Sequence, residues 1–286
     1  MSTATQAVDT KYHPAVVECC GDVAGDSAGS DLAATVQHRF EFCGLPITVG
    51  LTLGAVVGRT LGAPPGDGPV LTTFVNPLAF HLAKRESSYI DALAQFDLVL
   101  PDGIGIVWGL RLLKGMRTSR LSFDSTSLAL PVLRRAQEEG RSVMLIGGTR
   151  GVAMRAGARL AEAIPGLRLA RAMDGFCSFP EYETEVRLAK PDIVICGMGA
   201  PRQEALLLRL KQARAWHGVG FTCGGYFDQL QRRLCYYPSA VDRFNLRWLY
   251  RLVMEPRRLV RRYMLEYQDY CSILMHEALH RAVKFE

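Results

Sequence analysis

The sequence lacks the cysteine patterns of disulfide-stapled and zinc-binding proteins. Its eight cysteines contain no CxxC pair and form no cysteine–histidine cluster. Its N-terminus has neither the basic start nor the cleavable apolar segment of a secretory signal. We therefore expect reduced thiols and a cytoplasmic protein.

The sequence also has no apolar run long enough to cross a bilayer. A spanning helix needs about 20 consecutive apolar residues. The longest candidate, "LVLPDGIGIVWGLRLL", is interrupted by Pro101, Asp102 and Arg111. Any contact with a membrane is therefore expected to be peripheral.

Acidic residues are almost missing from one C-terminal segment, residues 243–262. It holds seven arginines against the single acid Glu255, an excess equal to the formal net charge of +6 for the whole chain. Glu255-Pro256 is predicted to end one helix and start the next. On a helix, four of the arginines fall within a narrow arc, which fits either a solvated face or a surface for anionic partners; they are Arg247, Arg251, Arg258 and Arg262.

Three regions follow from the distribution of residue types. Residues 1–38 are rich in small and polar residues and are predicted to form a flexible tail. Residues 39–234 alternate short β-rich runs with helical stretches, which predicts an α/β domain with a mostly parallel, Rossmann-like sheet covered by helices. This domain is predicted to begin with a strand, a turn and a strand in "FEFCGLPITVG" and to include a helix from about Pro77 to Gln95. Residues 235–286 are predicted to be a basic, amphipathic helical appendage.

Polar residues follow several predicted strands, where parallel sheets place their chemistry. Asn76 follows "VLTTFV", and Asp102 lies in "PDGIG" on the first turn beyond the strand "DLVL". A carboxylate there can act as a general base towards a substrate hydroxyl. The alternative is that Asp102 caps the following helix.

Glycines and polar side chains mark three further loops. In "LIGGTRG", the N–H groups of Gly147 and Gly148 could approach a phosphate, or the pair could simply make a tight turn. Neither this loop nor "GIGIVWG" has the GxGxxG spacing of a dinucleotide site. The other two loops could read a nucleotide or sugar, or merely start solvated helices; they are "CGMGAPRQE", with Gly199, Gln203 and Glu204, and "CGGYFDQL", with Asp228.

Several of these motifs together resemble one enzyme family. "TTFVNP", "LPDGIGI", "LIGG", "GMGAPRQE", "GGYFD" and "NLRWLYRLVMEPRR" occur in the order and approximate spacing of the WecG/TagA/CpsF glycosyltransferases, over about Arg39 to Tyr263. The resemblance implies an inverting enzyme that moves a sugar from a UDP-sugar to a polyprenyl-diphosphate-linked sugar. It implies a role in bacterial exopolysaccharide, capsule or cell-surface glycan biosynthesis. It also implies a protein on the inner face of the cytoplasmic membrane, at an anionic surface.

The resemblance assigns roles to residues by motif. Asp102 is implied to be the general base, with Asn76 and Arg120 close to it. Arg251, Arg258 and Arg261 are implied to grip the acceptor diphosphate. Donor binding is assigned to the glycine loops and polar strand-end residues, namely Thr73, Gly147, Gly148, Gly199, Gln203, Glu204 and Asp228.

One position departs from the family pattern. Two residues before Asn76 some members carry an active-site threonine, whereas this chain has Phe74, with Thr73 just upstream. Either Thr73 substitutes for it or that role is absent, so UDP-glucose and UDP-N-acetylmannosamine types of donor both remain open, with a slight preference for a neutral hexose.

The sequence contains no DxD motif, which many transferases use to bind a metal with the nucleotide diphosphate. We therefore expect no cofactor and no obligatory metal, with arginines and backbone amides neutralising the diphosphate. A homo-oligomer is possible, and no nucleic-acid partner is expected. Two other classes stay open as alternatives: an NAD-dependent enzyme that modifies nucleotide sugars, and a basic nucleic-acid-binding protein.

Overall fold

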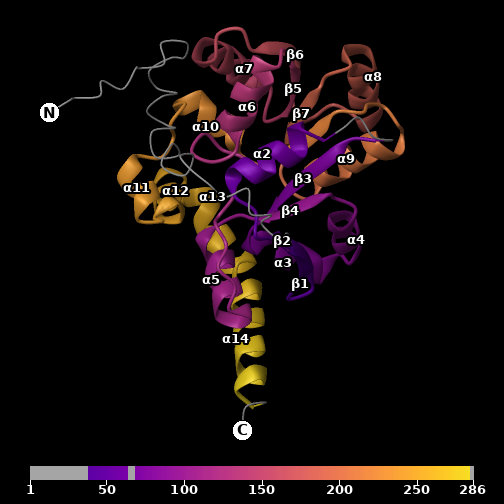
Figure 1. Cartoon of the computed structure of the whole chain (residues 1–286). Coiled ribbons are helices and arrows are strands. Elements are labelled where there is room, and N and C mark those ends of the chain that lie inside the picture. The colour runs from indigo at the N-terminus through magenta and orange to yellow at the C-terminus, as the bar shows by residue number, and fades with distance from the viewer. Residues whose placement is uncertain (1–37, 64–67, 284–286) are drawn as a thin grey trace, which may run out of the picture.

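One parallel sheet forms the centre of the computed structural model, which describes residues 38–63 and 68–283 (Figure 1). Within these residues, six strands pair in the order β4–β3–β8–β7–β5–β6, and every pairing is parallel. The strands are β3 (Val70–Val75), β4 (Leu98–Pro101), β5 (Ser142–Gly147), β6 (Arg168–Met173), β7 (Ile193–Gly197) and β8 (Val219–Thr222). The predicted α/β fold with a parallel sheet is confirmed.

Helices cover both faces of the sheet because the central strands are apolar on both sides. Val143 and Leu145 of β5 point into one hydrophobic cluster, and Met144 and Ile146 point into the other. The first face is covered by α2 (Leu53–Leu61), α6 (Ala129–Glu138), α7 (Val152–Ala163) and α10 (Tyr226–Arg232). The second is covered by α3 (Pro77–Arg85), α4 (Ser88–Ala94), α5 (Ile104–Lys114), α8 (Phe179–Ala189) and α9 (Arg202–Gln212).

A β-hairpin precedes the sheet, as predicted for "FEFCGLPITVG". β1 (His38–Phe42) pairs antiparallel with β2 (Leu45–Val49). The two turn residues, Cys43 and Gly44, have φ angles of 50° and 83°. A two-residue turn with both φ angles positive matches the right-handed twist of the strands. His38 thus begins β1, whereas the rest of the predicted tail, residues 1–37, lies outside the described residues.

The single helix predicted from about Pro77 to Gln95 is wrong. The chain forms α3 and α4 instead, because Glu86 takes an extended conformation with φ −143° and ψ 100°. The change of direction lets Tyr89 and Leu93 of α4 reach the core, where they are 3% and 0% exposed. Tertiary burial therefore outweighs continuous helical propensity here.

The region after α10 contains no strand within the described residues, as predicted. It consists of α11 (Ser239–Arg243), α12 (Arg247–Met254), α13 (Pro256–Arg261), a π-helical turn η2 (Arg262–Glu266) and α14 (Gln268–Val283). The predicted break at Glu255-Pro256 separates α12 from α13. No helix in the described ranges is long and apolar enough to span a bilayer.

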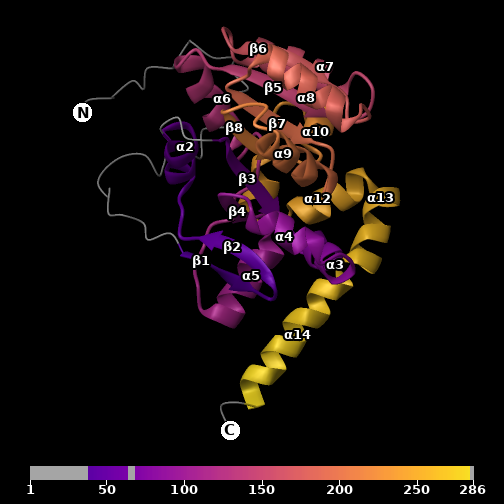
Figure 2. The same ribbon diagram turned by 90° about the vertical axis from the view of Figure 1, so that its right-hand side faces the viewer.

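Helix α14 is attached to the α/β domain at its first turns and then projects beyond it (Figures 1 and 2). Asp269 contacts His81 Nδ1 and Lys84 Nζ of α3, each at 2.6 Å. Tyr270 is 3% exposed and packs in the same hydrophobic cluster as Phe80, with ring centroids 4.7 Å apart. The start of α14 is therefore part of the folded core.

The expectation of reduced thiols holds for part of the chain. Cys43, Cys177, Cys196, Cys223 and Cys271 are free thiols. Cys235 is disulfide-bonded, so the prediction is wrong for this residue.

Candidate active site

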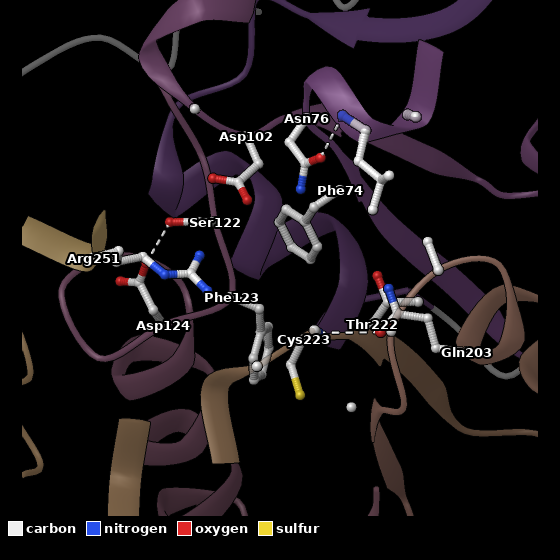
Figure 3. A pocket seen from close by; sticks show the side chains of 18 of the residues that line it. Phe74, Asn76, Asp102, Ser122, Phe123, Asp124, Gln203, Thr222, Cys223 and Arg251 are labelled. Carbon is white, nitrogen blue, oxygen red and sulfur yellow. Dashed lines mark hydrogen bonds between the residues drawn. The ribbon is translucent and has the colours of Figure 1, made fainter. Parts of the chain in front are cut away.

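A cavity of about 800 Å³ lies at the carboxyl ends of the sheet strands (Figure 3). β3 lies between β4, the strand that follows it in the chain, and β8, the last strand of the sheet. Loops diverge at such a reversal of strand order and leave a crevice. Residues after all six strands of the sheet line the cavity, and residues of α12 complete it; among them are Asn76, Asp102, Gly148, Gly175, Met198, Cys223 and Arg251.

Asp102 follows β4 directly and faces the cavity. Its backbone N–H donates to the carbonyl of Val75 at 2.8 Å, which fixes the loop against β3. No side chain caps α5, because Gly103 occupies the cap position, so the capping alternative for Asp102 is not seen. Burial raises the pKa of Asp102 above its usual 3.8, although the nearby Arg120 guanidinium opposes the rise. A partly buried carboxylate with a raised pKa is suited to accept a proton.

Asn76 combines a structural role with a free donor. Its Oδ1 accepts a hydrogen bond from the Leu78 N–H at 3.0 Å and so caps α3. This bond fixes the orientation of the amide and leaves its Nδ2 hydrogens free to donate. Figure 3 shows Asn76 beside Asp102, with both side chains reaching into the cavity. The pair offers an acceptor and a donor next to each other.

Arg120 belongs to a polar network that connects the α/β domain to α11 and α12. It donates to Ser122 Oγ at 3.2 Å and approaches Asp242 Oδ1 at 3.5 Å. Ser122 in turn donates to Asp124 Oδ2 at 2.7 Å. The network places the Arg120 guanidinium in the cavity wall.

The sequence reasoning missed the pair formed by Asp124 and Arg247. Arg247 donates to Asp124 Oδ2 at 2.8 Å, and the two side chains are only 9% and 11% exposed. Burial raises the pKa of Asp124, but Arg247 and Arg120 outweigh it and hold the value at about 2. Arg247 also lies over the Tyr237 ring at 4.8 Å. The only sequence signal was an acid among hydroxyl residues in "SFDSTS", which gave no indication of its partner.

The three arginines predicted to bind the acceptor diphosphate differ in where the structure places them. Arg251 lines the cavity, and Figure 3 shows it reaching toward the same space as Asp102. Its Nε is buried and has no hydrogen-bond partner among the described residues, which is costly unless a ligand supplies one. Arg261 is exposed and does not line the cavity. The side chain of Arg258 lies outside the described residues.

Gln203 lines the cavity and is held by buried groups behind it. Its Nε2 donates to Glu204 Oε1 at 2.9 Å, and its Oε1 accepts from the Gly224 N–H at 3.1 Å. Glu204 also accepts from Thr73 Oγ1 at 3.0 Å, and Thr73 contacts Thr222 Oγ1 at 2.9 Å. Burial raises the pKa of Glu204. Thr73 and Glu204 are fully buried and do not line the cavity, so they can act on a ligand only through Gln203 and Thr222.

The predicted glycine positions also divide. A Cβ on Gly147 would lie 2.2 Å from the Gly197 carbonyl oxygen, so this glycine allows β5 and β7 to approach closely outside the cavity. Gly148 lines the cavity, but its N–H donates to the Gly197 carbonyl at 3.0 Å and is not free for a phosphate. Gly199, with φ +79°, and Asp228 of α10 also line it.

Phe74 occupies the cavity wall at the position where the family resemblance predicts threonine in some members. Its ring contacts Phe123 with centroids 6.3 Å apart, which makes an apolar surface below Asn76. Neighbouring residues of a strand point to opposite faces. Thr73 is therefore turned to the other face of the strand from Phe74 and is not among the residues that line the cavity.

Residues 40–284 match the sequence model of the Glycosyl transferase WecG/TagA/CpsF family. The chain belongs to this family. It is a glycosyltransferase. This membership decides against the two alternatives that the sequence left open, an NAD-dependent enzyme that modifies nucleotide sugars and a nucleic-acid-binding protein. In this family member the motif residues Asn76, Asp102, Gln203 and Arg251 meet in one cavity.

Similar proteins from three bacteria match this chain over most of their own length. A UDP-Gal:alpha-D-GlcNAc-diphosphoundecaprenol beta-1,4-galactosyltransferase of Shigella boydii is 30% identical over 212 residues, 73% of this chain and 87% of the relative. An N-acetylglucosaminyldiphosphoundecaprenol N-acetyl-beta-D-mannosaminyltransferase of Bacillus subtilis is 29% identical. The match covers 73% of this chain and 80% of that relative. A Staphylococcus aureus protein of the same name is 26% identical, with 71% and 79% covered.

Proposed function

We propose that this protein transfers a hexosyl group, with inversion, from a UDP-sugar to a hydroxyl of a sugar carried on polyprenyl diphosphate. The names of the relatives, which act on N-acetylglucosaminyl diphosphoundecaprenol, support the acceptor class. The observation that carries the proposal is the placement of Asp102 and Arg251 in one cavity. A candidate base and a cation whose buried Nε has no hydrogen-bond partner among the described residues then reach the same substrate.

The reaction assigned to Asp102 is removal of the acceptor hydroxyl proton. As the proton moves to the carboxylate, the acceptor oxygen attacks the anomeric carbon of the donor sugar from the face opposite UDP. The bond between the anomeric carbon and the diphosphate oxygen breaks, and UDP leaves with the electron pair. The raised pKa of Asp102 strengthens it as a base. The amide of Asn76 would orient the sugar by donating to a hydroxyl.

Negative charge on the two diphosphates requires positive groups in the cavity. Arg120, Arg202 and Arg251 line it. Arg247 also lines it but is already neutralised by Asp124. We assign Arg251 to the acceptor diphosphate, because its buried Nε lacks a partner in the described part of the chain. Arginine forms strong charge-assisted hydrogen bonds to phosphate oxygens. In this proposal the arginines supply the charge that a metal supplies in transferases with a DxD motif, and no metal is needed.

The donor site is assigned to the side of the cavity near Gln203, Gly199 and Asp228. Gln203 is preset by Glu204 and Gly224, so it can read a ring edge or hydroxyl without reorganising. The apolar surface of Phe74 favours a neutral hexose from UDP-glucose or UDP-galactose over a donor that needs a hydroxyl contact there. UDP-N-acetylmannosamine remains the alternative donor.

The biological setting proposed here is bacterial exopolysaccharide, capsule or cell-surface glycan synthesis on the inner face of the cytoplasmic membrane. Support comes from the membrane-linked substrate in the relatives' names and from the arginines of α13. Exposed arginines attract anionic lipid headgroups.

A donor screen tests the proposal. The full-length protein is incubated with N-acetylglucosaminyl diphosphate on a short water-soluble lipid and with each of four UDP-sugars, with and without a chelator. We expect one donor to add a single hexose mass, chelator to have no effect, and NMR of the new linkage to show an inverted anomeric centre. Failure of all UDP-sugars to add mass, or retention at the anomeric carbon, would overturn the proposal.

A further inference from the structure

A second, apolar groove of about 750 Å³ lies between α5 and α14. α5 contributes Trp108 and Leu112, and α14 contributes Tyr270 and Leu274. Among the described residues that line it, Arg111 carries the only formal charge. The groove therefore differs in chemistry from the cavity described above, which contains three carboxylates and four arginines among its lining residues.

The walls of this groove are fixed by close packing of α14 on α5. A Cβ on Gly109 would lie 2.3 Å from Tyr270 Oη and 3.0 Å from Leu274 Cδ2, so only glycine allows the approach. The Tyr270 hydroxyl donates to the carbonyl of Gly105 at 2.9 Å. The contacts of Asp269 with α3 hold the helix start in place. The groove is therefore shaped by contacts within the protein itself.

The groove is continuous with the catalytic cavity. Pro77, Gly105, Trp108 and Tyr267 line both. Gly105 lies three residues after Asp102, and Trp108 lies about one helical turn further along α5. A single ligand can therefore occupy both spaces without leaving the protein surface.

The groove also exposes large apolar side chains. Trp108 is 62% exposed and Leu112 is 69% exposed, and their i, i+4 spacing places them on one face of α5. Exposed apolar surface that borders a charged cavity is typical of a binding site rather than of ordinary protein surface. The combination fits an amphiphile that has a charged head and an apolar tail.

We propose that this groove binds the isoprenoid chain of the acceptor, in the units next to the diphosphate. This inference rests on the proposed function, because it takes the diphosphate to lie beside Arg251 in the cavity. The chain then leaves past Trp108 and Tyr267, between α5 and α14, and continues along the projecting part of α14. The groove thereby selects lipid-linked acceptors over free sugar diphosphates.

Binding of farnesyl diphosphate and inorganic diphosphate, measured by calorimetry on the full chain, tests the groove without any sugar transfer. We expect the wild type to bind farnesyl diphosphate at least tenfold more tightly than inorganic diphosphate. Leu112→Glu should abolish this preference and keep the affinity for inorganic diphosphate. Leu188→Glu is the matched control, because Leu188 is 73% exposed on α8 and should keep the preference.

Several outcomes would overturn the inference. Equal affinity of the wild type for the two ligands, or equal losses in both variants, would show that the groove does not bind the chain. Leu112→Glu could instead keep the preference for farnesyl diphosphate and bind phosphatidylglycerol vesicles more weakly. That result would assign the groove to contact with the bilayer surface. A change from dimer to monomer in Leu112→Glu, with the preference unchanged, would assign it to a second copy.

The groove and the proposed function can fail separately. Sugar transfer to a short-lipid acceptor without any farnesyl preference would reject the groove and keep the function. A farnesyl preference without transfer from any UDP-sugar would keep the groove and reject the function. With both in place, KM for a farnesyl-linked acceptor should rise at least tenfold in Leu112→Glu, while KM for a methyl-linked acceptor stays unchanged.

Discussion

The strand-end loops and the C-terminal helices supply the cavity with functional groups in different ways. Asp102 and Asn76 reach it because the strands before them are parallel neighbours, so their ends meet at one edge of the sheet. Arg247 and Arg251 lie on a short helix that has no such constraint. Their positions depend on side chains far away in the sequence.

The difference appears most clearly among the arginines. Arg247 is 8% exposed because Asp124, 123 residues earlier, neutralises it. Arg251 is one turn further along α12 and faces the cavity, whereas Arg257 and Arg261 of α13 are exposed. A charge pattern on a helix therefore gives a set of candidates, and the partner in the folded domain determines which of them turns inward.

The largest expected effect is on turnover, when the strand-end carboxylate is removed. Asp102→Asn should lower kcat by roughly 10²–10⁴-fold, the usual cost of losing a general base, while UDP binding and the unfolding midpoint stay near wild type. Asp91→Asn, an exposed acid in the first turn of α4, is the control and should leave turnover unchanged. Near-normal turnover in Asp102→Asn would remove its catalytic role.

The pH dependence of the wild type sharpens this test. Because the folded pKa of Asp102 is raised above 3.8, the carboxylate forms only as the pH rises through that higher value. The acid limb of kcat/KM should therefore rise with pH and have its midpoint above 3.8. In Asp102→Asn this limb should disappear from the residual activity. A limb that persists would belong to another group.

The second largest effect is on stability, when the link between the two regions is broken. Arg247→Ala should lower the free energy of unfolding by about 3–5 kcal/mol, because it leaves Asp124 buried without its cation. Urea unfolding measures this, with Arg243→Ala, an exposed arginine of α11, expected to change stability by less than about 0.5 kcal/mol. Equal effects of the two changes would show that the pair does not hold α12.

Acid unfolding gives an independent measure of the same pair. The folded pKa of Asp124 is lowered to about 2 from 3.8, so its contribution to stability is complete above pH 3.8 and is lost as the pH falls towards 2. Arg247→Ala should shrink this contribution and move acid unfolding to higher pH. An unchanged acid transition would place the stabilising charge elsewhere.

How far the sequence predicts the site follows from the same comparison. The polar residues after Val75, Leu100 and Gly197 were predictable, because hydrophobic runs of strand length locate the sheet edge. The sequence could not show whether Thr73 or Phe74 faces the cavity. Strand alternation turns the two side chains to opposite faces, but only the structure shows which face borders the cavity.

The C-terminal region was predictable as helices but not as contacts. Hydrophobic spacing and Pro256 gave the helices and the break between α12 and α13. Nothing in the pattern around Asp124 pointed to Arg247, and the attachment of α14 through Asp269 and Tyr270 was also missed. Such contacts depend on tertiary packing, which local periodicity does not encode.

A third prediction separates Arg251 from the exposed arginines. Loss of a charge-assisted hydrogen bond costs about 1.5–3 kcal/mol, so Arg251→Ala should lower kcat/KM for a water-soluble acceptor about 10–150-fold. Arg257→Ala should leave this value unchanged, because Arg257 is exposed and lies outside the cavity lining. Equal values for both variants would remove Arg251 from the diphosphate site.

The smallest effects are expected on binding to the membrane surface. There, changes at Arg257 and Arg261 should matter more than a change at Arg251, the opposite of their effects on sugar transfer. Each exposed basic residue near anionic lipid contributes about 1 kcal/mol, so Arg257→Ala or Arg261→Ala should weaken binding to phosphatidylglycerol vesicles about fivefold. Arg251→Ala should weaken it less, because that side chain faces the cavity. Co-sedimentation at low and high salt measures this, with Arg59→Ala on α2 as the control, since Arg59 is exposed on a helix of the α/β domain. Salt should reduce the difference between wild type and the α13 variants, because it screens surface charge. If Arg59→Ala weakened binding as much as Arg257→Ala, net charge rather than α13 would govern membrane binding, and the C-terminal helices would contribute only the inward-facing arginines.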